Sequence, residues 1–196
     1  MHSKELQEIE KYILRRRRPE PARAALLVID MQAYFYALAQ PVLNNVLSLV
    51  QACKKNNMQI IYTRHGHRDI SRNGGMLLQW WGQSVQHGTA DWELIQQLPV
   101  ESQDLVLDKN RYSAFQGTDL ATRLQASSID ELIITGVLTN CCCETTARDA
   151  FVRDYRVFFI SDATATVNLD LHLSSLKNLA FGFAYLLSTQ ELLQYL

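Results

Sequence analysis

The chain has 196 residues, of which 47% are hydrophobic and 20% are charged, with only 8 glycines and 4 prolines. This length and composition predict one globular domain with a complete core and exclude an intrinsically disordered chain. The formal net charge of -1 gives no reason to expect nucleic acid or an anionic membrane as a partner, and no apolar run approaches the roughly 20 residues of a membrane-spanning helix.

The first twenty residues are predicted to form a helical extension (1–20) in front of the main domain (21–196). The charges of MHSKELQEIEKYILRRRRP stand on the wrong side of its apolar residues for a secretory signal peptide, so a cytoplasmic location is expected. The run Arg15–Arg18 is interpreted as the cationic end of a short amphipathic helix, where it would favour the helix dipole. A nuclear-import or polyanion-binding patch is the alternative interpretation.

Short apolar runs alternate with helical patterns along the rest of the chain. Their β-branched and aromatic residues, without clean alternation, predict strands that are covered on both faces. These strands are expected at 24–29, 59–63, 104–108, 131–137, 156–161 and 184–188. Helical patterns lie at 41–56, 118–127, 141–154 and 168–181. This order predicts an α/β fold, a three-layer α/β/α sandwich around a mostly parallel sheet of roughly six strands.

The segment 64–103 is a long connection between two predicted strands, and such connections are usually functional or form lids. It contains five glycines, three histidines and all three tryptophans of the chain. The tryptophans are expected either to form a pocket wall or simply to pack over the sheet, because aromatic residues serve both purposes.

Chemically useful side chains follow the predicted strands. In open parallel sheets, ligands bind beyond the carboxyl ends of the strands. An acid, several bases and a thiol are therefore expected along one edge of the sheet, supplied by Asp30, Arg64, His65, His67, Lys109, the cysteine run at 141–143 and Asp162.

Three of the four cysteines are consecutive: Cys141, Cys142 and Cys143. No C-x-x-C pair exists, which disfavours a zinc knuckle or a thioredoxin-type redox pair. A helix with Asn140 as its N-cap and Glu144 in its first turn would place all three thiols near the positive end of the helix dipole, which favours a thiolate. Helical spacing puts Cys143 on the apolar face and predicts that it is core. Periodicity leaves both Cys141 and Cys142 as candidate nucleophiles.

Three stretches resemble the isochorismatase-like cysteine hydrolases: ALLVIDMQAYF, DKNRYSAFQGTDL and ITGVLTNCCCETTARDAFVRDYRVFFISDATAT. The resemblance runs from about residue 22 to the C-terminus and keeps the order of the motifs. The third stretch is most similar to nicotinamidase-type amidohydrolases, whereas RYSAF also looks like a segment of isochorismate-cleaving enzymes. The resemblance implies that Asp30, Lys109 and Cys142 are catalytic.

The resemblance also implies a mechanism. Asp30 would take the thiol proton and later pass it to the leaving ammonia, and Lys109 would stabilise the thiolate. Cys142 would attack an amide carbon to give an acyl-enzyme that water hydrolyses. A cis peptide between Val137 and Leu138 would turn the backbone N–H groups of Leu138 and Cys142 toward the developing oxyanion.

Pocket residues are expected around this triad. Aromatic walls for a planar ring and polar groups for its substituents are expected from Phe35, Trp80, Trp81, Tyr112 and Phe115, and from Gln32, His67 and Thr139.

The metal-binding nicotinamidases carry a Thr-Arg-Asp-x-His stretch and a later histidine. Here the first stretch reads TRHGH, so His65 replaces the Asp and His67 stands at the His. Ser84 stands at the later position, with His87 displaced by three residues. No cofactor is required by the mechanism. A zinc or iron site made by His65, His67 and His87 is the alternative to histidines that line the pocket or form hydrogen bonds.

Three functions follow from the resemblance. The first is a cysteine amidohydrolase that acts on a small planar amide, with nicotinamide as the best single candidate. The second is an isochorismatase that cleaves a vinyl ether and releases pyruvate. The third is a catalytically silent binding module on the same fold, which the intact triad disfavours. The expected partners are a small-molecule substrate and further copies of the chain in a homo-oligomer, with neither nucleic acid nor membrane.

Overall fold

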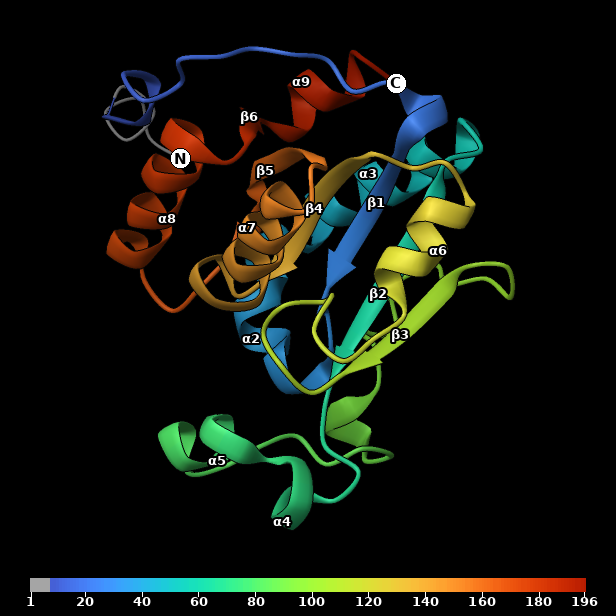
Figure 1. Ribbon diagram of the computed structural model, residues 1–196, viewed down its shortest axis with the longest axis vertical. Coiled ribbons are helices and arrows are strands. Elements are labelled where there is room, and N and C mark those ends of the chain that lie inside the picture. The colour runs from blue at the N-terminus through green and yellow to red at the C-terminus, as the bar shows by residue number, and fades with distance from the viewer. Residues whose placement is uncertain (1–7) are drawn as a thin grey trace.

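The computed structural model describes residues 8–196, and its centre is one sheet with the strand order β3-β2-β1-β4-β5-β6. Every registered strand pair is parallel. Figure 1 shows helices in front of this sheet and behind it, which confirms the predicted three-layer sandwich. The strands are β1 (Ala24–Ile29), β2 (Gln59–His65), β3 (Leu105–Lys109), β4 (Glu131–Val137), β5 (Arg156–Ala165) and β6 (Tyr185–Leu187).

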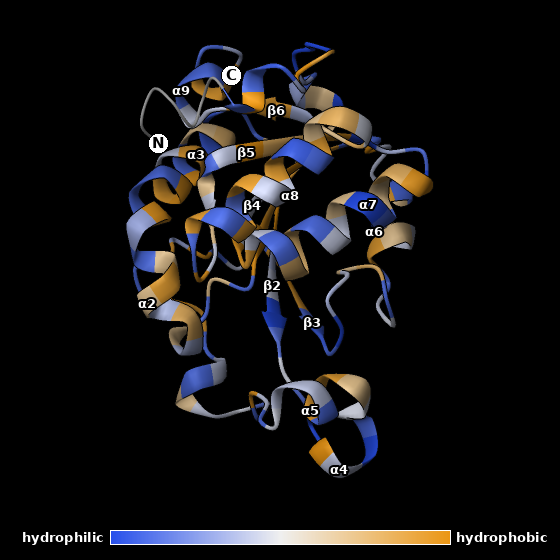
Figure 2. Ribbon diagram, turned by 90° about the vertical axis from the view of Figure 1, so that its left-hand side faces the viewer, coloured by the Kyte–Doolittle hydropathy of each residue, from blue (hydrophilic) through white to orange (hydrophobic). Residues whose placement is uncertain are grey.

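Helices pack on both faces of the sheet. One face is covered by α6 (Leu120–Ala126), α7 (Glu144–Val152) and α8 (Leu169–Gly182), and the other by α2 (Tyr36–Ala39), α3 (Leu43–Lys55) and α9 (Thr189–Leu193). The central strand β1 is buried along its whole length and sends alternate side chains into the two cores. Figure 2 shows hydrophilic and hydrophobic residues alternating along the covering helices, as amphipathic helices require.

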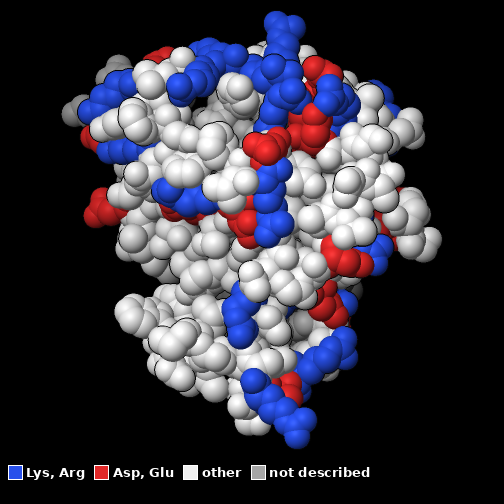
Figure 3. Space-filling model, viewed as in Figure 1, with Lys and Arg blue, Asp and Glu red and all other residues white. Residues whose placement is uncertain are grey.

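The connection between β2 and β3 contains two further short helices, α4 (Ile70–Asn73) and α5 (Gly75–Trp81). Figure 1 shows that both lie beyond the carboxyl end of β2, away from the sandwich. The part of the surface over α5 carries few charges (Figure 3). Met76, Trp80 and Trp81 are all exposed there.

The N-terminal segment differs from the expectation. Residues 1–7 of the predicted extension lie outside the described residues, helix is present only at residues 8–10, and Arg15–Arg18 lie in an irregular segment. The prediction of a cationic helix end is therefore wrong. Pro19 directly follows the run and disfavours helical geometry in the residue before it. Tertiary contacts then hold the segment, including an ion pair of Arg16 with Glu191 and a stacking contact of Arg18 with Tyr195.

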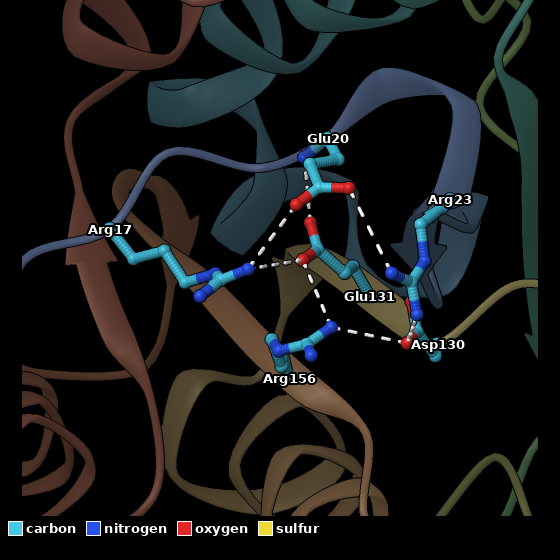
Figure 4. A network of polar contacts seen from close by, with 6 residues as sticks. All are labelled: Arg17, Glu20, Arg23, Asp130, Glu131 and Arg156. Atoms are coloured by element: carbon cyan, nitrogen blue, oxygen red, sulfur yellow. Dashed lines mark hydrogen bonds and ion pairs between the residues drawn. The ribbon is translucent and has the colours of Figure 1, made fainter.

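A cluster of charged residues fixes this segment to the amino ends of the strands. Figure 4 shows the cluster, here called the N-terminal charge cluster: Arg17, Glu20, Arg23, Asp130, Glu131 and Arg156. Its centre is Glu131, which is fully buried at the start of β4. Glu131 accepts a 2.7 Å hydrogen bond from the Glu20 backbone N–H. Arg17 and Arg156 approach its other carboxylate oxygen to 3.6 and 3.4 Å.

Two further contacts bring residues 8–20 onto the domain: Ile9 is buried in the core beside α8, and Glu8 pairs with Lys177. The boundary at residue 21 stays a prediction. Within residues 8–196 we find no helix with the length and hydropathy needed to cross a bilayer.

Candidate active site

Asp30, Lys109 and Cys142 meet at the carboxyl edge of the sheet. Asp30 follows β1, Lys109 ends β3, and Cys142 lies in the turn after β4. The Lys109 Nζ is 2.7 Å from Asp30 Oδ2 and donates a 3.4 Å hydrogen bond to the Cys142 Sγ. All three are buried, with exposed fractions of 0%, 3% and 7% respectively. The three predicted catalytic side chains, which are far apart in the sequence, are thus in direct contact.

Thr63 supports the acid of this group. The register of β1 on β2 pairs Val28 with Tyr62, which places Thr63 beside Asp30. The Thr63 hydroxyl donates a 2.6 Å hydrogen bond to Asp30 Oδ1 and accepts a 3.0 Å bond from the Asp30 backbone N–H. Asp30 itself has a φ of 49°, in the left-handed region that few residues other than glycine occupy. The sequence analysis missed Thr63, although this residue ends the predicted strand 59–63 and could therefore have been expected at the carboxyl edge of the sheet.

The electrostatics of the site keep the resting thiol protonated. Burial raises the pKa of the Cys142 thiol well above its ordinary value; the Lys109 charge opposes this rise, and the Asp30 charge and hydrogen bond add to it. Burial acts to lower the pKa of Lys109, but the neighbouring Asp30 and Cys142 raise it overall. Lys109 is therefore a cation at neutral pH, and the thiol proton is held beside Asp30.

The backbone that carries the cysteines is a π-helical turn at Thr139–Cys143, and α7 begins only at Glu144. The predicted N-cap role of Asn140 is wrong, because its side-chain oxygen instead accepts a 2.6 Å hydrogen bond from the Thr166 hydroxyl. The carbonyl of Leu138 closes the turn by accepting hydrogen bonds from the N–H groups of Cys141 and Cys143. The turn therefore places the three thiols in different surroundings.

The surroundings separate the thiols clearly. Cys143 is fully buried in the core, as predicted. Cys141 is partly exposed, and burial raises the pKa of its thiol as well. Cys142 is the thiol that contacts Lys109.

The strand end before the turn also has special geometry. The Val137–Leu138 peptide is cis, as the resemblance implied. Gly136 has a φ of 110°, and a Cβ at this position would collide with the backbone oxygen of Ile29. Glycine is thus required here, because it lets β4 approach β1 closely at the point where both strands lead into the site.

A cavity of about 370 Å³ opens beside Cys142. This volume lies in the range of small-ligand pockets. No Asp, Glu, Lys or Arg is among the residues that line it: Tyr34, Phe35, Leu38, His65, Leu77, Trp81, Gln83, Ser84, Val85, Tyr112, Leu138, Cys141 and Cys142. A larger cavity, near Arg15 and Tyr155, lies away from the triad. The pocket beside Cys142 is therefore aromatic and uncharged.

Three of the predicted aromatic residues, Phe35, Trp81 and Tyr112, line this cavity, and two do not. Trp80 is 76% exposed, because it turns away from its neighbour Trp81 on the same short helix. Phe115 is buried instead against Tyr155, with ring centroids 5.7 Å apart. The expectation that Trp80 and Phe115 form pocket walls is wrong.

The three side chains that were predicted to supply polar contacts to the substrate instead have polar partners within the protein. Gln32 is fully buried and bonds to backbone groups of His65 and Trp92. The Nδ1 of His67 lies 3.0 Å from the Asn73 side-chain oxygen. The Thr139 hydroxyl lies 2.9 Å from Nδ1 of His172. None of Gln32, His67 and Thr139 lines the cavity, whereas sequence reasoning missed Tyr34, Leu38, Leu77, Gln83, Ser84 and Val85, for which no local signal exists.

The alternative metal site of His65, His67 and His87 is not assembled among the described residues. The rings of His65 and His67 lie edge to face with centroids 5.4 Å apart. His87 stacks on Trp92, and its Nε2 lies 3.4 Å from Asp108. Within residues 8–196, no three His, Cys, Asp or Glu side chains are arranged to hold a metal ion. The side chains of His65, His67 and His87 thus do not fit a shared zinc or iron.

A doubly wound parallel sheet with a buried acid, cation and thiol at its carboxyl edge suits nucleophilic catalysis on a small molecule bound there. The family model described as "Isochorismatase domain" matches residues 24–191, and the chain belongs to this family of hydrolases.

Individual relatives agree with this assignment. The chain is 47% identical to "Nicotinamidase 3" of Arabidopsis thaliana over 93% of both chains. It is 35% identical to "Isochorismatase" of Bacillus subtilis over 91% of this chain but only 59% of that protein. Among solved structures, a cysteine hydrolase from Pseudomonas syringae pv. phaseolicola superimposes with a TM-score of 0.88 at 31% identity, covering 92% of this chain and 95% of that one.

Proposed function

We propose that this protein hydrolyses the amide bond of a small, planar, uncharged amide, with nicotinamide as the first candidate. One observation carries the proposal: the buried triad of Asp30, Lys109 and Cys142 stands beside an aromatic pocket without charged side chains. The 47% identity to a nicotinamidase supports the choice of nicotinamide.

In the proposed reaction, Asp30 takes the proton of the Cys142 thiol while the sulfur attacks the carboxamide carbon. Asp30 then gives this proton to the leaving nitrogen, so that ammonia departs and a thioester remains on Cys142. Water, deprotonated by Asp30, attacks the thioester and releases the carboxylic acid and the thiol. Lys109 keeps its charge throughout and stabilises the thiolate as it forms.

The oxyanion of the tetrahedral intermediate needs hydrogen-bond donors of its own. We assign this role to the backbone N–H groups of Leu138, which precedes the π-helical turn, and of Cys142, which lies within it. Removal of one such donor typically costs about 10²–10³ in rate. Leu138 and Cys142 both line the cavity, which supports the assignment.

The uncharged lining favours an amide over isochorismate. Isochorismate carries two carboxylates, and a buried carboxylate is costly unless a cation or several donors pair with it. Lys109 is already paired with Asp30 and is not among the residues that line the cavity. Isochorismatase activity remains the second candidate because of the 35% identity to an isochorismatase.

One assay panel decides between these functions. Purified protein is tested for ammonia release from nicotinamide and for pyruvate release from isochorismate, with Cys142→Ala beside it. We expect ammonia release from the wild type and none from Cys142→Ala. Pyruvate release without ammonia release would establish the second candidate. A folded wild type that turns over neither substrate would support the silent binding module.

We further propose that catalysis needs no metal, because the imidazole of His87 is engaged with Trp92 and Asp108 and the Nδ1 of His67 with Asn73. Activity should then survive dialysis against a chelator, and its loss with recovery on adding zinc or iron would contradict this.

We also propose that the protein works in the cytoplasm as a homo-oligomer. All four cysteines are free thiols, which suits a reducing compartment. Exposed apolar side chains on α7 and α8, including Val152 and Phe181, offer a surface for subunit contact. Light scattering after size-exclusion chromatography measures the oligomeric state, and a monomer at micromolar concentration would contradict the second part.

A further inference from the structure

His65 occupies the central position of the site without a role in the triad. It is the last residue of β2, the strand between β1 and β3, and the sheet register pairs it with Lys109. Its side chain lines the cavity beside Cys142. Substrate bound against the thiol would therefore lie next to this imidazole.

The backbone of His65 is held rigidly. Gln32 accepts a 2.7 Å hydrogen bond from the His65 N–H and donates a 3.0 Å bond to the His65 carbonyl. Gln32 is fully buried and is itself fixed by a 2.7 Å bond to the Trp92 carbonyl. Hydrogen bonds of this kind, from a buried neighbouring side chain, keep a binding residue in a fixed geometry.

The His65 ring contacts the His67 ring edge to face, but its polar atoms have no role in the protein's own hydrogen bonds among the described residues. Its Nδ1 is buried without a hydrogen-bond partner, and among residues 8–196 nothing forms a hydrogen bond to the ring. Burial, with a further contribution from the Lys109 charge, lowers the pKa of His65 to about 4, so the ring is neutral at physiological pH. A neutral imidazole has one N–H donor and one acceptor nitrogen to offer. A buried polar group without a partner in a native structure calls for an explanation, and a ligand is one.

Most other polar groups of the lining are already paired. Gln83 donates a 3.0 Å hydrogen bond to the Tyr34 hydroxyl, and Trp81 donates a 2.7 Å bond to the Tyr112 hydroxyl. Ser84 is the exception, since its hydroxyl is also buried without a partner. Of these two residues, His65 is the better placed to bind a substrate. Gln32 holds its backbone, and the sheet register pairs it with Lys109 of the triad.

We propose that His65 is a specificity-determining residue, whose neutral imidazole donates a hydrogen bond to a ring nitrogen of the substrate. The site would then select nitrogen-containing aromatic amides over carbocyclic amides of the same shape. This inference rests on the proposed amidohydrolase function. His65 takes no part in bond breaking, so its contribution appears in the choice of substrate.

The test compares nicotinamide with benzamide, which lacks only the ring nitrogen. We measure kcat/KM for both amides in the wild type and in His65→Leu. We also measure their dissociation constants in the Cys142→Ala and His65→Leu/Cys142→Ala proteins, so that an amide turned over too slowly still gives a value. The wild type should prefer nicotinamide. His65→Leu should reduce this preference about tenfold, as the loss of one ordinary hydrogen bond predicts, with benzamide little affected.

Further variants keep the test independent of folding. His65→Asn and His65→Gln place an amide near the positions of Nδ1 and Nε2, and one of them should restore part of the preference. His87→Leu, which removes an imidazole outside the pocket, is the matched control and should leave the preference unchanged.

An equal loss for both amides in His65→Leu, or an unchanged preference, would overturn the assignment. So would a preference that Ser84→Ala abolishes and His65→Leu does not. A wild type that hydrolyses and binds neither amide would instead refute the proposed function. A wild type that hydrolyses both amides equally well would refute only the role of His65.

Discussion

A fully buried carboxylate lies at the amino edge of the sheet and another at its carboxyl edge, and the protein uses them differently. Glu131 is fully buried at the start of β4, and Asp30 is fully buried just after the end of the neighbouring strand β1. Glu131 is surrounded by a backbone N–H and two guanidinium groups, those of Arg17 and Arg156. The Asp30 carboxylate contacts one ammonium group, that of Lys109, and one hydroxyl group, that of Thr63.

The difference lies in what the cation also contacts. In the N-terminal charge cluster, the groups of residues 8–196 that contact Glu131 are a backbone N–H and two guanidinium groups, which do not exchange protons near neutral pH, so we expect this cluster only to hold the chain together. At the other edge, Lys109 is shared between a carboxylate and a thiol. A proton can therefore move from Cys142 to Asp30 while Lys109 remains beside a negative charge. We therefore propose that the shared cation and the thiol, and not burial of the carboxylate alone, make the carboxyl edge reactive.

The largest predicted effect is at the carboxyl edge. Cys142→Ala removes the proposed nucleophile, and Asp30→Asn removes the proton acceptor, so each should lower kcat for amide hydrolysis by at least about 10³-fold. Ammonia release measures this, with circular dichroism to show that the variants are folded. Cys141→Ala is the matched control, because it deletes the adjacent thiol that does not contact Lys109, and it should keep most of the activity. A dead Cys141→Ala variant would mean that the nucleophile is assigned one residue too far along the chain.

The second prediction concerns the amino edge. Glu131→Ala leaves two arginines and the Glu20 N–H without their buried partner, and it should lower the free energy of unfolding by about 3 kcal/mol. For a chain of this length, that lowers Tm by about 6–12 °C. The kcat of the folded protein should not change. Urea denaturation and activity at low temperature measure the two quantities.

Glu20→Gln is the control for this edge. Glu20 pairs with the same Arg17, but its carboxylate is exposed, so its loss should cost no more than about 0.5 kcal/mol. A Glu131→Ala protein that is folded but inactive would show that the two edges are coupled, and the comparison between them would fail.

A strand could be predicted from the sequence where its own residues form a continuous apolar run. The apolar run at 131–137 is found as β4 with the same bounds, because both faces of a central strand are covered. Strand β5 was expected to end at residue 161 but runs to Ala165. Its last residues pair with Gly136 and Val137 beyond a register shift, and this pairing depends on the neighbouring strand. The composition of residues 162–165 alone therefore does not predict that the strand continues.

The site shows the same limit. Motif resemblance located Asp30, Lys109 and Cys142, whereas composition alone left Cys141 and Cys142 undecided. The pocket lining could not be predicted, since it depends on how the long connection between β2 and β3 folds back over the sheet. Trp80 and Trp81 are adjacent in the sequence, yet only Trp81 lines the cavity. Which of two neighbours faces inward is set by tertiary packing.

A smaller effect is expected at Thr63, which supports Asp30 with its hydroxyl. Thr63→Val keeps the shape but removes two hydrogen bonds, so Asp30 Oδ1 loses its donor and the Asp30 backbone N–H loses its acceptor. We expect kcat to fall about tenfold, because the Asp30 carboxylate loses the buried hydrogen bond that orients it. Thr164→Val is the control, since Thr164 is buried at the same edge and its hydroxyl has no partner among the described residues. An unchanged kcat in Thr63→Val would show that Lys109 alone orients the acid.

The smallest effect that we predict is an absence of thiolate absorbance at neutral pH. This measurement tests most directly how the two edges of the sheet differ. Burial raises the pKa of Cys142 well above its ordinary value, so at neutral pH the resting enzyme should contain a thiol and an Asp30–Lys109 ion pair. The ultraviolet spectrum of the wild type minus that of Cys142→Ala should then show no thiolate absorbance at neutral pH, and the absorbance should appear only in strongly alkaline solution. A thiolate band at neutral pH would mean that Asp30 already holds the proton and that Lys109 pairs with sulfur at rest. With no band, both edges of the sheet hold a carboxylate–cation pair at rest, and the carboxyl edge differs only in having a thiol that can give up its proton when substrate arrives.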